Sequence, residues 1–146
     1  MTVPRVPGIF VPRSRLTALF DHATTRPVTV LRAPAGSGKT TALACWARDR
    51  RDVAWVSLDD DDNDERRLWA AILFALRRSP RPPEDSPVCR LEPPEPGRRT
   101  EFLADLGDAF AGPREPVWLV LDDVQEITRP EAVEALAALA RHQPPM

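Results

Sequence analysis

The sequence predicts an α/β fold with a mainly parallel β-sheet, and three observations support this class. Short apolar runs of strand length alternate with segments whose apolar residues recur at helical spacing. A loop that contains glycines follows the first apolar run, and two carboxylates end the last one. Strands that alternate with helices usually pair in parallel, because each helix returns the chain to the same end of the sheet.

The N-terminal part of the chain contains two expected helices and two expected strands. They are a lead-in helix over 13–23, a strand over 28–32, a helix over 39–50 and a strand over 53–58. Leu16, Leu19, Phe20 and Ala23 share a face of the first helix, and Leu43, Trp46 and Ala47 share a face of the second. A Pro-containing arm precedes the first helix.

An acidic run at 59–65 precedes the third expected helix, in which Leu68, Ile72, Ala75 and Leu76 share a face. Six of its seven residues are carboxylates. The run lacks the glycine and the glutamate that an EF-hand calcium loop needs at its sixth and twelfth positions. We expect Asn63 to cap the helix and Asp64 and Glu65 to complement its N-terminal dipole, with metal binding as the less favoured alternative.

The second half of the chain contains a proline-rich segment, two expected helices and one expected strand. Residues 80–97 hold seven of the 17 prolines, which excludes a regular helix or a central strand and favours an exposed connector. The next helix is marked by Phe102, Leu106, Ala109 and Phe110 and ends at Gly112-Pro113. The strand at 117–124 follows it. The last helix begins with a capping box, Thr128-x-x-Glu131, and is expected to turn Val133, Leu136, Ala137 and Ala140 to the core.

The loop from Ala33 to Thr41, with the sequence Ala-Pro-Ala-Gly-Ser-Gly-Lys-Thr-Thr, has the residues that a P-loop requires. Such a loop directs backbone N–H groups at phosphate oxygens and adds the dipole of a helix N-terminus. Lys39 would reach the outer phosphates, and the Thr40 hydroxyl would bind Mg²⁺. The first glycine of the pattern G-x-x-x-x-G-K-[ST] is replaced here by Ala33. An ordinary strand-to-helix turn is the alternative.

The segment 117–124, Val-Trp-Leu-Val-Leu-Asp-Asp-Val, resembles a Walker B strand. A buried parallel strand delivers carboxylates to the carboxyl edge of its sheet. Asp122 would then hold Mg²⁺, directly or through water, and Asp123 would orient or deprotonate the attacking water. A buried strand that ends in a polar turn is the alternative, but the two motifs together favour a P-loop NTPase.

These motifs give a complete set of predicted site residues. The cofactor-binding residues are Ala33, Pro34, Ala35, Gly36, Ser37, Gly38, Lys39, Thr40, Thr41 and Asp122. The Mg²⁺ ligands are Thr40 and Asp122, and the catalytic residue is Asp123. The expected cofactors are ATP or ADP with Mg²⁺.

Composition narrows the classes of protein that the chain can belong to. Its 146 residues, of which 42% are hydrophobic, can bury one modest core. A net charge of −2 gives no basic surface for nucleic acid, so we expect no direct DNA contact. No apolar run is long enough to cross a membrane, and a cytoplasmic location is expected. Cys45, Cys89, His22 and His142 lack the spacing of disulfide frameworks or metal sites.

Four blocks of the chain resemble the large MalT-like LuxR-family transcription regulators, which carry a signal-transducing (STAND) P-loop NTPase domain. The blocks are Val11-Pro-Arg-Ser-Arg-Leu16, Ala33 to Thr41, Ala54-Trp-Val-Ser-Leu-Asp59 with Asp62-Asn-Asp64, and Leu119-Val-Leu-Asp-Asp123. They occur in the order of the family at comparable spacing. The third block is the most specific to the family, whereas very many ATPases share the Walker motifs.

The resemblance implies a nucleotide-operated switch in a signal-responsive regulator. ATP would favour an open, self-associating form of the full-length protein and ADP a closed one, while a distant helix-turn-helix domain reads DNA. It also implies an incomplete three-layer sandwich, in which residues 1–27 form an arm and lead-in helix and residues 28–146 a partial NTPase domain. The family continues past residue 146 with a strand that lies centrally in the sheet, so we expect the isolated chain to be unstable or prone to aggregation.

Hydrolysis is expected to be slow or absent, because the chain offers no evident further cation for the γ-phosphate. Arg98 and Arg99 form the adjacent pair nearest to the connector, and we expect both to be solvated. Two other classes stay open. One is a P-loop enzyme such as a kinase or ATPase, and the other is an inert remnant that keeps the outline of the fold without turnover.

Overall fold

Two parallel strands, β1 (Val53–Ser57) and β2 (Trp118–Asp122), form the sheet in the computed structural model, which describes residues 3–4, 14–78, 86–111 and 117–142. Val53 lies opposite Trp118 and Ser57 opposite Asp122. The Leu58 N–H donates to the Asp122 carbonyl at 3.0 Å and extends the ladder by one residue. The predicted α/β class with a parallel sheet is confirmed.

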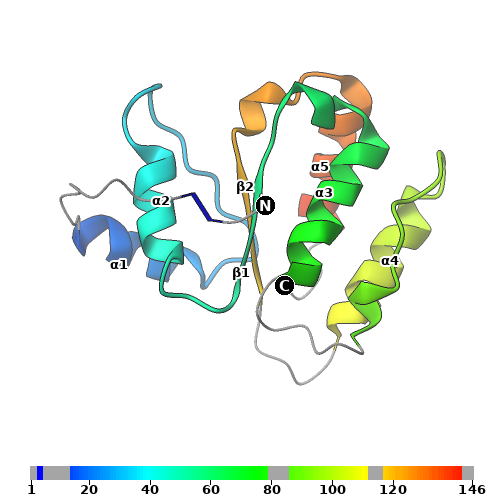
Figure 1. Ribbon diagram of the computed structural model, residues 1–146, viewed down its shortest axis with the longest axis horizontal. Helices are drawn as coiled ribbons and strands as arrows, with labels where there is room; N and C mark the ends of the chain where they lie inside the picture. Colours follow the sequence, from blue (N-terminus) through cyan, green and yellow to red (C-terminus); the bar gives the residue numbers. More distant parts are fainter. Residues whose placement is uncertain (1–2, 5–13, 79–85, 112–116, 143–146) are drawn as a thin grey trace. The chain divides into compact units, whose positions relative to one another are not determined.

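The chain divides into two compact units, residues 3–51 and residues 52–146, and each is described by itself. Within its described residues, the second unit contains both strands, three α-helices and three single 3₁₀ turns. After β1 come η1 (Asp60–Asn63), α3 (Glu65–Arg78), η2 (Pro87–Cys89) and α4 (Arg99–Phe110), and after β2 come η3 (Val124–Glu126) and α5 (Pro130–His142). Figure 1 shows α3, α4 and α5 together on one side of the two strands.

One face of α3 forms the centre of the core of this unit, as its spacing predicts. Its buried residues are Leu68, Trp69, Ile72, Leu73, Ala75 and Leu76. The Trp69 ring meets the Phe102 ring of α4 edge to face, with centroids 4.8 Å apart. Val56 of β1 and Leu106 of α4 are fully buried in the same cluster. This packing fixes α3 and α4 on the sheet.

The buried face of α5 differs from the predicted one by about one residue. Ala132, Ala135 and Leu139 are buried, and Leu136 is partly buried against the core as predicted, whereas Val133 is 46% exposed. The predicted capping box is also wrong, because the Thr128 N–H donates to the Asn63 side chain rather than to Glu131. A contact 65 positions away in sequence therefore sets the start of this helix.

The start of α3 is capped by Asp64, not by Asn63 as predicted. The Asp64 carboxylate accepts a hydrogen bond from the Arg67 N–H at 3.0 Å. Asp59 caps η1 instead, in a reciprocal box with Asp62. Burial raises the pKa of the Asp62 carboxyl, and the neighbouring Asp59 charge acts in the same direction, against the hydrogen bond from the Asp59 N–H.

The proline-rich segment is exposed only in part. Val88 in η2 is fully buried, and the Arg77 guanidinium donates to the carbonyls of Val88 and Leu91. The expectation of an exposed connector is therefore wrong for this stretch, because one arginine of α3 holds its backbone against the core. Residues 79–85 and the Gly112-Pro113 helix end lie outside the described residues.

The first unit contains α1 (Ser14–Ala23) and α2 (Lys39–Ala47), which pack through an aromatic pair. The rings of Phe20 and Trp46 meet edge to face, with centroids 6.1 Å apart. The Trp46 indole donates to the Asp21 carboxylate at 2.8 Å, and the Arg50 guanidinium lies 4.6 Å from the Trp46 ring centroid. These contacts join the helix before the loop to the far end of the helix after it.

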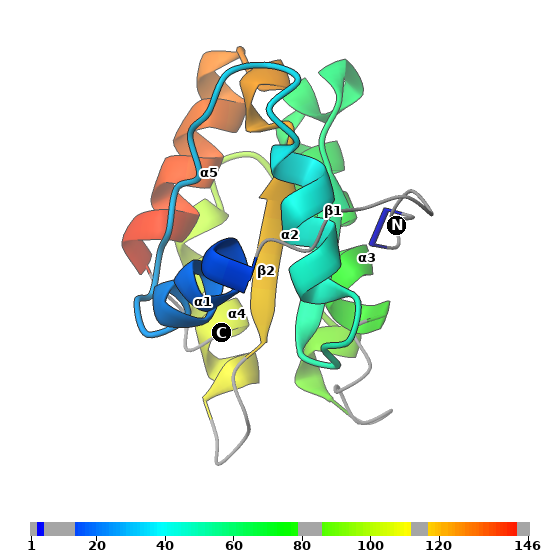
Figure 2. The same ribbon diagram turned by 90° about the vertical axis from the view of Figure 1, so that its left-hand side faces the viewer.

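The predicted strand at 28–32 is wrong. These residues form an irregular segment between α1 and α2, and their apolar side chains are exposed, with Val30 at 75%. Figure 2 shows this long loop. A strand is stabilised by ladder hydrogen bonds with a neighbour, and within the described residues the sheet contains β1 and β2 only. Apolar character alone does not supply such a neighbour.

Candidate functional site

The loop at 33–38 leads directly into α2, which begins at Lys39. Gly36 and Gly38 both adopt left-handed backbone conformations, with φ of 72° and 83°. This region is accessible to glycine at little cost, so the two glycines turn the backbone at alternate positions of the loop. The Ala42 N–H then donates to the Gly38 carbonyl at 2.9 Å and starts the helix.

Lys39 is the single lysine of the chain, and its side chain lies back across the loop. The ammonium donates to the Ala33 carbonyl at 2.8 Å and to the Pro34 carbonyl at 3.1 Å. The contact with Ala33 uses the backbone, so the missing first glycine of the motif does not prevent it. The structure thus places the cation at the start of a helix and over the loop that precedes it.

The loop residues fit a phosphate group. The first turn of α2 has no acidic residue, and Gly38 at its N-cap has no side chain that would compete for the helix N–H groups. A Cβ added at Gly36 or at Gly38 would meet no atom within 4 Å, and residues 33–38 are exposed. An anion can therefore approach the helix N-terminus and the Lys39 ammonium together.

Asp122 and Asp123 occupy the turn that follows β2. Asp122 is half-buried, and its carbonyl accepts the last ladder hydrogen bond from Leu58. Asp123 is exposed and is the one non-glycine residue of the described chain with positive φ, at 58°. Its carboxylate accepts from the Gln125 side chain at 2.9 Å, and its carbonyl accepts from the Glu126 N–H at 3.0 Å. A non-glycine residue keeps a left-handed backbone where its surroundings hold it there, so this turn is held by its local contacts.

The predicted site residues fall into two groups. Ala33 to Thr41 lie together on one loop and the first turn of α2, in the first unit, and Asp122 and Asp123 share one turn in the second. A Mg²⁺ ion held jointly by Thr40 and Asp122 stays a prediction, as does the catalytic role of Asp123. No three acidic, histidine or cysteine side chains of the described residues converge as a metal site.

The sequence does not predict the contacts that the Asn63 side chain makes with residues 126–129. This side chain is 3% exposed and forms hydrogen bonds in both directions. The amide donates to the carbonyl of Glu126 at 2.8 Å, and its oxygen accepts from the N–H groups of Thr128 at 2.7 Å and Arg129 at 2.8 Å. The Asp-Asn-Asp block was the available signal, but it gave no indication of a partner so distant in sequence.

Arg99 was expected to be solvated, and this is wrong. Its guanidinium forms two hydrogen bonds with the Glu65 carboxylate, at 2.7 and 2.8 Å, and each side chain is only about a quarter exposed. The Arg99 hydrogen bond lowers the pKa of Glu65, and the same bond raises the pKa of Arg99. Arg98, by contrast, is exposed and pairs with Glu101.

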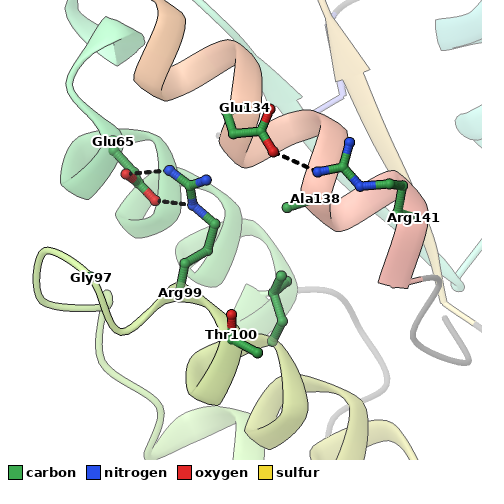
Figure 3. A pocket seen from close by; sticks show the side chains of 8 residues that line it. Glu65, Gly97, Arg99, Thr100, Glu134, Ala138 and Arg141 are labelled. Atoms are coloured by element: carbon green, nitrogen blue, oxygen red, sulfur yellow. Dashed lines mark hydrogen bonds and ion pairs between the residues drawn. The ribbon is translucent and has the colours of Figure 1, made fainter.

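The Glu65–Arg99 pair lines a cavity of about 380 Å³ between α3, α4 and α5 (Figure 3). A second pair, Glu134 with Arg141, lies on its other side. The two arginines are each matched by a glutamate, so the charged lining sums to zero. A polyphosphate site requires excess positive charge, and the loop before α2 meets this requirement where the cavity does not.

Comparison with protein families finds a match over most of the chain. A family model described as an AAA ATPase domain matches residues 12–146. This range includes the loop before α2 and the turn after β2. Among the described residues, every helix is too short or too polar to span a membrane.

Proposed function

This chain belongs to the AAA ATPase domain family, and we propose that it is the ATP-binding segment of a signal-responsive transcription regulator, in which the bound nucleotide acts as a switch. Family membership supports nucleotide binding of the NTPase type. The regulatory role is the finer part of the proposal. It is supported by the four sequence blocks, above all by the Trp-x-Ser-Leu-Asp block that precedes Asp62-Asn-Asp64.

The observation that carries the proposal is the position of the Lys39 ammonium. It lies over the loop at the N-terminus of α2, held by the carbonyls of Ala33 and Pro34. A helix N-terminus and a lysine cation both favour phosphate oxygens. We assign Lys39 to the outer phosphates, and the backbone from Ala33 to Thr41 to the remaining phosphate contacts.

Mg²⁺ would neutralise charge on the bound phosphates. We assign its ligation to the Thr40 hydroxyl and the Asp122 carboxylate, which are the ligand types that Mg²⁺ prefers. Asp123 is assigned to orient a water near the outer phosphate. A switch also requires that ATP and ADP prefer different conformations of the protein. A nucleotide that binds both conformations equally well does not change their populations.

The test is the affinity of the purified chain for Mg²⁺-ATP and Mg²⁺-ADP, measured by titration calorimetry. Lys39→Ala should weaken binding by about 10- to 100-fold, because a hydrogen bond to a charged group is worth roughly 1.5–3 kcal/mol. Arg48→Ala is the matched control, since Arg48 is an exposed cation just past the other end of α2. The control should stay within about twofold of wild type.

Three outcomes would count against parts of the proposal. Absence of binding by the wild-type chain would contradict the site and favour an inert remnant. The same hydrogen-exchange pattern in saturating Mg²⁺-ATP and in saturating Mg²⁺-ADP would remove the support for a switch in this segment. Steady-state turnover above about 1 per second, the lower end of typical enzyme rates, would favour a P-loop enzyme.

A further inference from the structure

The two chain segments that leave the sheet beside Asp122 are joined by one side chain. β1 and β2 are parallel, so both continue past the same edge, and the last ladder hydrogen bond joins Leu58 to Asp122. Beyond that bond β1 leads into η1 and β2 leads into η3. In Figure 1 these two turns lie next to each other above the strands. Asn63, the last residue of η1, bridges the gap between them.

The Asn63 side chain is held on its own side before it reaches across. Its amide nitrogen donates to the backbone carbonyl of Asp60 at 3.1 Å and to the Asp60 carboxylate at 3.2 Å. The Asp59–Asp62 box fixes the same 3₁₀ turn. Asn63 therefore presents its carboxamide in one orientation, and both ends of that group are matched by partners of the correct polarity.

Across the gap, Asn63 fixes the far end of the turn that carries Asp123. The near end is fixed at Asp122 by the ladder. The far end is fixed by the Asn63 side chain, whose amide donates to the Glu126 carbonyl and whose oxygen accepts from the N–H groups of Thr128 and Arg129. Only Asp123 to Gln125 lie between these anchors. A left-handed backbone at a non-glycine residue persists only where the surroundings over-determine it. The two anchors provide that constraint.

We propose that Asn63 is a positioning residue for the Asp122–Asp123 turn and that it acts on the Mg²⁺-dependent part of nucleotide binding. This inference rests on the proposed function. Asn63 does not touch the nucleotide or the ion in this scheme. It holds the backbone from which both carboxylates project, so that their direction is set before a ligand arrives.

The experiment compares wild type, Asn63→Ala and Asn63→Asp. Asn63→Ala removes every bridging hydrogen bond. Asn63→Asp keeps an acceptor for Thr128 and Arg129 but loses the donors to Glu126 and Asp60. Ile72→Val is the matched control, because it removes one methylene from the core of the same unit and leaves the bridge intact.

The main measurement is the ATP dissociation constant in Mg²⁺ and in excess EDTA, by calorimetry. Mg²⁺ should tighten binding by tenfold or more in wild type and in Ile72→Val, and by less than threefold in Asn63→Ala. The dissociation constant in EDTA should change by less than twofold, because the loop before α2 is untouched. A second measurement, hydrogen exchange of the ligand-free chain, should show the amides of 126–129 exchanging at least tenfold faster in Asn63→Ala.

The outcomes separate this inference from the proposed function. Absence of ATP binding by wild type contradicts both. Three other outcomes overturn the inference alone. The first is that wild type binds ATP and Mg²⁺ tightens binding to Asn63→Ala as much as to wild type. The others are that Asn63→Ala loses the same affinity in Mg²⁺ and in EDTA, or that Mg²⁺ has no effect on wild type. If Asn63→Ala fails to fold by circular dichroism, Asn63→Asp takes its place. Failure of both to fold would assign Asn63 to stability and overturn the inference.

Discussion

The hydrogen-bonded pair between Glu65 and Arg99 should contribute measurably to stability, unlike most ion pairs at protein surfaces. Its two hydrogen bonds are 2.7 and 2.8 Å long, and both side chains are about three-quarters shielded from water. The Trp69 indole donates a further hydrogen bond to Glu65 at 3.2 Å. The pair thus joins the start of α3 to the start of α4 within a defined network.

The expected magnitude follows from this partial burial. An exposed ion pair contributes roughly 0.2–1 kcal/mol, whereas removing one partner of a buried pair costs about 3–5 kcal/mol. Because Glu65 and Arg99 lie between these limits, we expect Glu65→Gln to cost about 2 kcal/mol. The coupling energy in a double-mutant cycle with Arg99→Gln should be about 1–2 kcal/mol.

The contribution of this pair should also depend on pH in a defined direction. Arg99 lowers the pKa of Glu65 below its ordinary value of 4.5, so the unfolded chain binds a proton more readily than the folded one. The stabilisation is therefore fully present above the unfolded pKa and is lost as pH falls through the folded pKa. The difference in free energy of unfolding between wild type and Glu65→Gln should be constant near neutral pH and should shrink in acid.

The assay is urea denaturation of the wild type, both single variants and the double variant, followed by far-UV circular dichroism. It is carried out at pH 7 and at successively lower pH. A coupling energy below about 0.3 kcal/mol at pH 7 would show that the pair behaves as an exposed one. If the difference in free energy of unfolding between wild type and Glu65→Gln widened in acid, the assigned direction of the Glu65 pKa shift would be refuted.

Two further predictions concern the core and the loop before α2. Ile72→Ala should lower the free energy of unfolding by about 2–5 kcal/mol, because Ile72 is fully buried in the α3 cluster, and a loss below about 1 kcal/mol in urea denaturation would contradict that burial. Gly38→Ala should cost about 1–2 kcal/mol through its left-handed backbone alone, since a Cβ there meets no atom within 4 Å. Asparagine tolerates a left-handed backbone better than alanine does, so Gly38→Asn should lower the free energy of unfolding by less than Gly38→Ala in the same assay.

The elements that the sequence predicted correctly are those with local signals. The start of α2 at Lys39 follows from the Gly-x-Gly turn before it, and the strands at β1 and β2 follow from short apolar runs bounded by polar residues. The buried face of α3 follows from helical spacing, because a wide apolar stripe has only one way to face a core. Each of these signals lies within a few residues of the structure that it determines.

The features that the sequence did not predict depend on partners distant along the chain. The segment 28–32 has the composition of a strand, but pairing rather than composition makes a strand, and it pairs with neither β1 nor β2. The rotation of α5 was misjudged because alanines occupy several of its faces. The start of α5 is fixed by the Asn63 side-chain oxygen, which accepts hydrogen bonds from the N–H groups of Thr128 and Arg129.

The acidic run at 59–65 shows why charge density alone is weak evidence for a metal site. Every carboxylate of the run has a partner within the chain. Asp59 accepts from the Asp61 N–H, Asp60 from Asn63, Asp61 from the Arg67 guanidinium, Asp62 from the Asp59 N–H, Asp64 from the Arg67 N–H and Glu65 from Arg99. Three of these six partners are backbone N–H groups at turn and helix starts, which favour negative charge, and the other three are side-chain donors.

These pairings have a consequence beyond the run itself. The Asp59–Asp62 box holds the 3₁₀ turn, and the carbonyl and carboxylate of Asp60 accept from the Asn63 amide, so these contacts set the direction in which Asn63 projects. Asn63 in turn anchors the backbone after Asp123 through Glu126. The acidic run therefore acts on the Asp122–Asp123 turn through one neutral side chain. Removing a carboxylate such as Asp60 should loosen Asn63 without removing any group that we assign to the nucleotide.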